Sequence, residues 1–273
     1  MNNIWIMTWY TLREAMARKV FISFLIISAL VLIFMLVIFG SNTSIDIVAG
    51  MKNAKLNLPM EQIVSQLELL IISPLTGLCI LLSIFASASF IPIMLEKGNI
   101  DILLSKPVSR DQLLLGKFFG GLLVVLLNIA FLVLGVWLII SIKFSFWNLS
   151  FLWTILLVTF TFAILYSLIV LISVITKGST FGMMVAYLIY LILSPVLHLA
   201  NNNIDMFTSS TVVKSVVKIF YYIIPQTSEV SGTITRNLAL GNAVDSYQPI
   251  WISLIFLVLT MGIAISVFRK KDF

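Results

Sequence analysis

The stretch LEKGNIDILLSKPVSRDQLLLGKFFGGLLVVLLNIAFLVLGVWLIISI (residues 95–142) places a short charged connector directly before a long apolar run. From Glu96 to Lys117 the connector carries seven charged side chains, whereas the run from Phe118 to Ile142 carries none. A helix needs about 20 apolar residues to cross the hydrocarbon core of a bilayer. The stretch therefore predicts a membrane-spanning helix that is entered from a polar connector.

The whole chain has the composition of a protein dissolved in lipid. Of its 273 residues, 60% are hydrophobic and 10% are charged, against roughly 45–50% and about 25% in soluble domains. Six apolar runs are long enough to span a membrane, and none contains Asp, Glu, Lys or Arg. They cover residues 20–40, 69–95, 118–142, 151–175, 181–199 and 250–268. We expect an all-α polytopic membrane protein with a single transmembrane domain over residues 1–273.

The positions of Lys and Arg predict the orientation of these spans. With the N-terminus inside the cell, the inner segments hold 11 of the 17 basic residues and the outer segments hold 6. Inner loops of membrane proteins are enriched in Lys and Arg, so this orientation is favoured. Both termini are then cytoplasmic, the long loop 200–249 is extracellular, and the net charge of +6 faces lipid headgroups rather than nucleic acid.

Two shorter helices are predicted outside the spans. Before the first span, large apolar residues recur at helical spacing, namely Trp5, Trp9, Leu12 and Met16. This pattern predicts an amphipathic helix on the inner membrane surface, with a simple anchor as the alternative role. In the loop 200–249, an apolar helical face runs from Val213 to Ile224 and ends at Pro225. That helix either caps a substrate path or only fills the gap between spans.

Catalytic motifs are missing from the sequence. Gly116-Lys117 is followed by Phe118, so there is no phosphate-binding loop of the G-x-x-x-x-G-K-[ST] type. The single cysteine, Cys79, excludes an internal disulfide and is expected to be a buried packing thiol. The single histidine, His198, is expected to be hydrogen-bonded locally or to contact substrate. We therefore expect no catalytic residue, no cofactor and no metal in this chain.

The predicted spans also lack the charged residues with which ion-coupled pumps bind their ion. Hydroxyl and amide side chains such as Thr76 and Asn128 can join helices by hydrogen bonds, but they cannot store a proton. Transport against a gradient would then need energy from another subunit.

Two rows of small residues mark places where helices can approach closely. Gly116 and Gly120 form G-x-x-x-G where the third span begins, and Gly178, Gly182 and Ala186 lead into the fifth span. Each row is either a packing surface within the chain or a seam with a second subunit.

The connector has a predictable structure of its own. Pro107 excludes the residue before it from helical geometry, and Ser109 with Gln112 forms a capping box that starts a new helix. A helix from Arg110 to Ile142 would be about 50 Å long, against about 30 Å of hydrocarbon. The third helix must therefore project into the cytoplasm.

Before the proline, Ile100, Leu103 and Leu104 share one side of a helical turn. The connector is thus expected to be a short amphipathic helix, a kink and a rigid lever into the membrane. A partner that pushes on the short helix would move the lever. The alternative is an ordinary loop that rests on headgroups.

The connector resembles that of the type-2 ABC transporter permease family. The matching residues are Glu96-x-Gly98, Leu103-Leu104-Ser105-x-Pro107-Val108-Ser109-Arg110 and Gly116-Lys117. The similarity is greatest to the branch that includes gliding-motility permeases and permeases for the maturation of nitrous oxide reductase. The two ends of the chain, Leu12–Lys19 and Phe268–Phe273, also resemble the ends of this family.

The resemblance implies a permease subunit of an exporter in a prokaryotic cytoplasmic membrane. Two permease subunits, identical or homologous, would pair with two cytoplasmic ATPase subunits that hold ATP and Mg, and the second and fifth spans would lie near the seam. Residues 96–117 would contain the coupling helix. Its ATPase-coupling residues would be Glu96, Gly98, Asp101, Leu104, Pro107, Ser109 and Arg110. A membrane assembly or maturation factor and a passive secondary transporter without an ATPase are the alternatives.

Overall fold

The computed structural model describes residues 2–17, 19–40, 60–96, 98–100, 108–204 and 210–271. Within these ranges every regular element is a helix. Six of the described helical segments are long and apolar enough to cross a membrane, as the sequence predicts. They are Ile22–Phe39, Val64–Met94, Arg110–Phe144, Leu149–Thr176, Thr180–Asn202 and Gln248–Lys270. The chain is an all-α polytopic membrane protein.

The described helices follow one another along the chain with short breaks. The first half contains α1 (Asn2–Ala17), α2 (Lys19–Gly40), α4 (Met60–Ser87), α5 (Phe90–Met94) and α7 (Arg110–Phe144). The middle contains η1 (Leu149–Leu152), α8 (Trp153–Thr176), α9 (Thr180–Leu188), η2 (Ile189–Leu193) and α10 (Ser194–Asn202). The last part contains α12 (Thr211–Ile223), η3 (Glu229–Ile234), α13 (Thr235–Ala239) and α14 (Gln248–Lys270).

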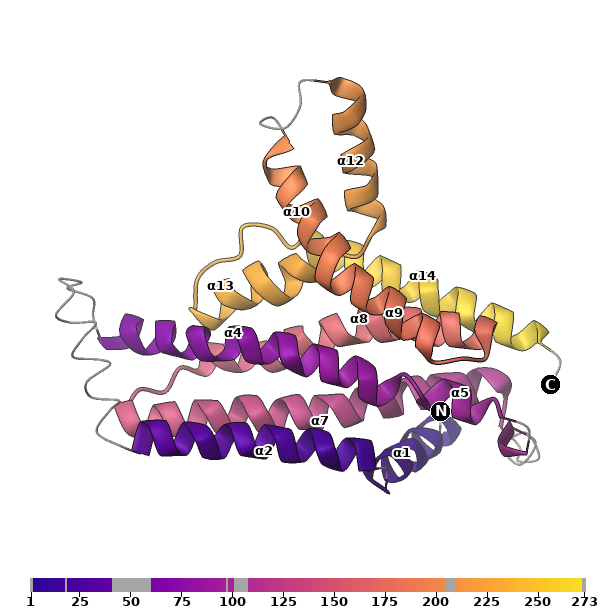
Figure 1. Ribbon diagram of the computed structural model, residues 1–273, viewed down its shortest axis with the longest axis horizontal. Coiled ribbons are helices and arrows are strands. Elements are labelled where there is room, and N and C mark those ends of the chain that lie inside the picture. Colours follow the sequence, from indigo (N-terminus) through magenta and orange to yellow (C-terminus); the bar gives the residue numbers. More distant parts are fainter. Residues whose placement is uncertain are drawn as a thin grey trace.

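The long helices lie lengthwise beside one another in a bundle (Figure 1). α1 and α7 begin at the same end of this bundle at which α14 ends. We call it the connector end, because Glu96 and Ser109 flank the connector there. The opposite end, where α4 begins and α7 ends, is called the far end.

The central helix of the bundle is α8. In an apolar window of 18 residues within its span, Leu149–Thr176, 67% of the residues are buried, whereas only 11% are buried in such a window of the fifth span, Thr180–Asn202. The rings of Phe162 and Tyr166 are fully buried in α8, and Tyr166 stacks on Phe118 of α7 with 5.5 Å between ring centroids. Packing of α7, α9 and α14 around α8 therefore forms the core. The fifth span contacts α8 through α9, and most of its remaining surface is exposed.

Several polar side chains in the spans form hydrogen bonds within their own helix rather than between helices. Asn128 of α7 accepts a hydrogen bond from Ser28 of α2 at 2.8 Å, and Ser167 of α8 bonds to Thr260 of α14 at 2.7 Å. The hydroxyls of Thr76, Ser83, Ser87 and Thr161 instead donate to carbonyls of their own helices. Such local bonding satisfies a hydroxyl in lipid without a partner helix.

Two predicted spans differ from the observed ones. The second candidate span begins earlier, at Val64 within α4. It breaks after Ser87, because Pro92 lacks an N–H and its ring would clash with the carbonyl four residues earlier. The fifth is not a continuous helix: a π-helical turn, η2, precedes Ser194 and Pro195. Here too a proline removes a backbone donor, and the helix loosens just before it.

The loop between the last two spans contains the helix that the sequence predicts before Pro225. It is α12, and it packs against α10 in a hairpin that projects from the side of the bundle (Figure 1). Most of its large apolar side chains are exposed, including Val212, Ile219 and Ile223. Tyr221, by contrast, is buried, and Ile224, which follows the last turn of α12, packs against the core of the bundle.

Candidate functional site

The third long helix starts as the connector sequence predicts. Ser109 accepts a hydrogen bond from the Gln112 amide at 3.3 Å, and its own amide donates to the Gln112 side chain at 3.2 Å. This confirms the capping box, and α7 then continues without a break for 35 residues. The long third helix that the sequence predicts is thus present and continuous.

The first turn of α7 binds the last turn of α14. The Arg110 guanidinium donates to the carbonyls of Phe268, Arg269 and Lys271 at 3.5, 3.1 and 2.6 Å. In return, the Arg269 guanidinium donates to both carboxylate oxygens of Asp111, with 2.7 Å between Nε and Oδ1. A cation that caps the carbonyl end of a helix also interacts favourably with its dipole. We call this set of contacts the clamp.

The clamp extends to the central helix through Lys271. Its ammonium donates to the carbonyls of Val174 and Ile175, at 2.5 and 3.1 Å, in the last turn of α8. Partial burial, and then the charge of Lys177, lower the pKa of Lys271 from its usual value. The ends of α7, α8 and α14 are therefore joined in one polar cluster.

α1 packs closely along the first part of α7. A Cβ atom added to Gly116 would lie 2.4 Å from the Cβ of Met7, and one added to Gly120 would lie 2.4 Å from the Cβ of Thr11. These separations leave no room for a side chain. The first small-residue row therefore packs within the chain, against the N-terminal helix.

An ion pair fixes the same helix. The Lys117 ammonium lies 2.5 Å from the Glu14 carboxylate, and the Lys117 side chain is only 4% exposed. Asn3 donates to Gln112 at 3.4 Å at the start of both helices. The sequence analysis places Lys117 just before the apolar run of the third span, and the structure shows that its side chain is buried there against α1.

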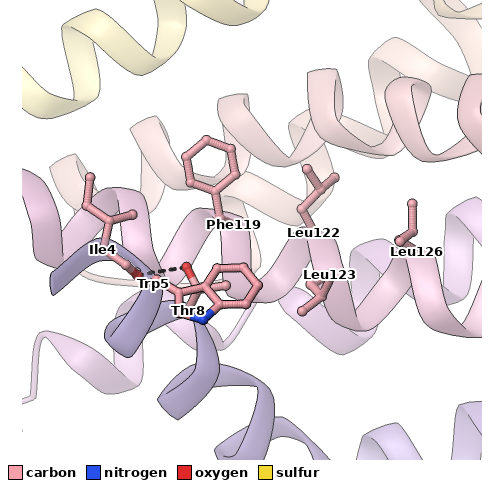
Figure 2. Close-up of a pocket in the computed structure, with 7 residues that line it drawn as sticks. All are labelled: Ile4, Trp5, Thr8, Phe119, Leu122, Leu123 and Leu126. Atoms are coloured by element: carbon pink, nitrogen blue, oxygen red, sulfur yellow. Dashed lines mark hydrogen bonds between the residues drawn. The ribbon is translucent and has the colours of Figure 1, made fainter. Parts of the chain in front are cut away.

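A groove of about 440 Å³ remains between α1 and α7 on the lipid side of their contact. Its wall is almost entirely apolar, and Figure 2 shows the residues that line it: Ile4, Trp5, Thr8, Phe119, Leu122, Leu123 and Leu126. The Thr8 hydroxyl donates to the Ile4 carbonyl at 2.9 Å, so it adds no unsatisfied polar group. The exposed residues Trp5, Trp9 and Met16 form the outward stripe of α1, whereas Leu12 is buried.

On the other side of the connector, Glu96 is exposed at the end of the second span. Gly98 has φ of 93°, a left-handed conformation that glycine adopts without strain. Asn99 then donates to the Ile93 carbonyl at 3.0 Å and caps α5. Asp101, Leu104 and Pro107 lie outside the described residues, as does most of the predicted short helix.

The members of the second small-residue row, Gly178, Gly182 and Ala186, have different surroundings in the structure. Gly182 of α9 lies against α8, where an added Cβ would approach the Ile169 carbonyl to 3.3 Å, and Ala186 is fully buried. Gly178 lies in the turn before α9, where an added Cβ would contact only Thr176, at 3.9 Å from its hydroxyl oxygen. The two helical members therefore face the core of the chain, while Phe181 and Met184 are on the exposed face of α9.

A second polar cluster lies where α10, α12 and η3 meet. His198 Nδ1 is 2.9 Å from a Glu229 oxygen, and the Tyr221 hydroxyl donates to the same oxygen at 2.5 Å. Burial and the neighbouring carboxylate raise the pKa of Tyr221. His198 therefore has the local partner that the sequence allowed for. Cys79 is buried in the apolar core, in agreement with a packing role.

The sequence analysis does not predict the clamp or the packing of α1 against α7. Both depend on contacts between residues more than 100 positions apart, such as Arg110 with Phe268 and Lys117 with Glu14. One signal was available, because Asp111 and Arg269 carry opposite charges at the same side of the membrane.

Comparison with known protein families gives one result for nearly the whole chain. The family model described as "ABC-2 family transporter protein" matches residues 8–273. A search of curated proteins found no match to the chain.

Proposed function

Because the chain belongs to the ABC-2 transporter family, we propose that it is the membrane permease subunit of an exporter, driven by a separate cytoplasmic ATPase. The family supplies a membrane component of an ABC transporter. The proposal adds the direction of transport, the ATPase dimer that holds ATP and Mg, a second permease subunit and a prokaryotic cytoplasmic membrane with both termini inside.

One observation carries the proposal, namely that the connector leads into a cluster joining the ends of four helices. α7 starts at the connector, and its first two turns bind α14 through Arg110 and Asp111, and α1 through Lys117. Lys271 adds the end of α8. A force on residues 96–110 would therefore act on four helices together rather than on one loop.

The mechanism follows from this linkage. Closure of the ATPase dimer upon ATP binding would press on the connector, and α7 would transmit the displacement because it is one uninterrupted helix of 35 residues. Its tight contact with α1 and its stacking on α8 leave little room for independent bending. The displacement would reach the far end and open a path between two permease subunits.

The test is to co-express the chain with the ATPase and purify the complex in mild detergent. Glu96 is exposed and Glu96→Lys leaves the clamp intact, so this variant changes the docking surface without disturbing the fold. We expect wild-type chain to retain the ATPase and to increase its ATP hydrolysis. Glu96→Lys should lose at least tenfold in retention or in stimulation, while membrane insertion is unchanged.

Lys218→Glu is the matched control, since it reverses an exposed charge on α12, far along the chain from the connector. It should behave as wild type. Arg110→Glu should also uncouple the two subunits, because it removes the cap of α14. Purification of the wild-type chain without any nucleotide-hydrolysing companion, or wild-type stimulation by both connector variants, would contradict the proposal.

A further inference from the structure

One carboxyl group lies inside the bundle, where the sequence predicts none. Glu68 is on α4, within the stretch Val64–Met94 that is long and apolar enough to cross a membrane. The predicted span begins at residue 69, so the sequence analysis places Glu68 in the loop directly before it, whereas the structure buries this residue in the bundle. Glu68 is 0% exposed.

The carboxyl group has one hydrogen-bond donor among the described residues. Asn148, in the link between α7 and η1, donates from Nδ2 to one Glu68 oxygen at 2.8 Å. The same amide nitrogen donates to the Ala239 carbonyl of α13 at 2.9 Å, so both of its hydrogens are used. The other Glu68 oxygen, Oε1, is buried and has no partner in the described part of the chain.

The link that holds Asn148 is itself fixed. The Trp137 indole N–H donates to the Asn148 carbonyl at 2.9 Å, and Trp137 packs edge-on against Trp147 with 5.1 Å between ring centroids. Phe151 of η1, three residues after Asn148, is fully buried. The amide is therefore presented to Glu68 by a rigid segment and cannot be replaced easily by another donor.

No cation compensates the carboxyl group within the described residues. The elements that pack on α4 are α2, α7, α8, α9 and α13. Their basic residues at the far end are Lys143 of α7 and Arg236 of α13; both are exposed, and neither forms an ion pair with Glu68. The described part of α8 contributes no charged residue to its span.

These contacts determine whether the Glu68 carboxyl group is protonated. A buried carboxylate is stable when it accepts two or three hydrogen bonds or faces a cation, and otherwise it takes up a proton. Among the described residues, Glu68 has one neutral donor and no cation. The cost of one unpaired oxygen in a neutral acid is about 1–3 kcal/mol, which is far below the cost of burying an unpaired charge.

We propose that Glu68 is a proton-binding site within the membrane domain, and that its neutral carboxyl group latches α13 to the spans through Asn148. The proton is bound at a Glu68 carboxylate oxygen and remains there while the far end is packed. When the proton leaves, the carboxylate needs water, and the contacts of α4 with Asn148 and α13 must open to admit it. The proposal goes beyond the proposed function and does not depend on the ATPase.

The first experiment detects the proton directly. Infrared difference spectra of the purified full chain in detergent, wild type minus Glu68→Gln, should show the C=O stretching band of a protonated carboxyl group at pH 7. The band should shift in deuterium oxide, and Asn148→Leu should shift it again, because the carbonyl loses its hydrogen bond. A wild-type spectrum without such a band, or with the signature of a carboxylate instead, would overturn the proposal.

The second experiment uses linkage between protonation and folding. An exposed glutamate in the unfolded chain is ionised above about pH 4.3. The folded chain then binds one proton more than the unfolded chain, and stability falls as pH rises. We expect the unfolding equilibrium constant in mixed micelles to rise by up to tenfold per pH unit from pH 5 to 7 because of this one group. Glu68→Gln, which is neutral at every pH, should remove this dependence and be as stable as wild type at pH 5.

Two controls separate the latch from a general packing effect. Gln66→Ala changes an exposed side chain on the same helix and should keep the wild-type pH dependence. Glu68→Ala removes both the proton site and the contact to Asn148, so it should destabilise the chain and abolish the pH dependence. If Glu68→Gln is as unstable as Glu68→Ala, the group acts as a carboxylate, and the proposal is wrong.

Discussion

Lys117 is the buried cation of the connector end, and its partner, Glu14, comes from the N-terminal helix. Removing one member of a buried ion pair leaves an uncompensated charge and costs about 3–5 kcal/mol. We therefore expect Glu14→Ala to lower the free energy of unfolding by about 3–5 kcal/mol, measured by denaturation in mixed micelles. The double variant Glu14→Leu/Lys117→Met, which removes both charges, should recover most of this loss. A change below about 1 kcal/mol for Glu14→Ala would show that Lys117 finds other solvation, as exposed pairs do.

At the scale of elements, α1 can pack closely on α7 because Gly116 and Gly120 carry no side chain. Each would place a new Cβ 2.4 Å from a side chain of α1. We expect Gly116→Ala and Gly120→Ala each to destabilise the chain by about 1–3 kcal/mol through overpacking, and to reduce ATPase stimulation in the complex. Gly262→Ala on α14 is the control, because nothing lies within 4 Å of its added Cβ. It should be neutral or stabilising by up to about 1 kcal/mol. Equal effects at all three glycines would mean that helix propensity, and not the close approach of α1, sets the result.

For the whole molecule, the largely exposed fifth span offers the surface on which a second permease subunit would pack. Gly182 and Ala186 face the core, so the free face is that of Phe181 and Met184. In a Cys79→Ser background, we expect Met184→Cys to form a disulfide-linked pair of chains in native membranes under mild oxidation. Gly182→Cys should not do so. Equal crosslinking at both positions, or none at Met184, would place the seam on another helix.

The sequence predicted best what depends on neighbouring residues. The capping box at Ser109, the end of α12 before Pro225 and the six apolar runs are set by local chemistry, and all are present. Span limits were less accurate, because a charged residue ends a hydropathy run but need not end a helix. Glu68 and Lys117 both lie directly outside a predicted apolar run, yet both are buried. Each can be buried because it has a polar partner from another part of the chain.

The clamp could not be predicted from the sequence, since no local sequence pattern indicates which backbone carbonyls the Arg110 side chain contacts. The same holds for the small-residue rows. Spacing alone indicates that Gly116 and Gly182 favour close contact, but only the fold shows that their neighbours are α1 and α8. The residues 101–107 of the predicted coupling helix remain a prediction.

The clamp also has a consequence for biosynthesis. Arg110 and Phe268 are 158 positions apart, so a ribosome that adds about 5–20 residues per second makes the second roughly 8–30 s after the first. During that interval the lever is already inserted, yet the last helix that steadies it does not exist. If the proposed ATPase acts through the connector, a nascent chain could not couple to it until the final span has been translated and the clamp has formed.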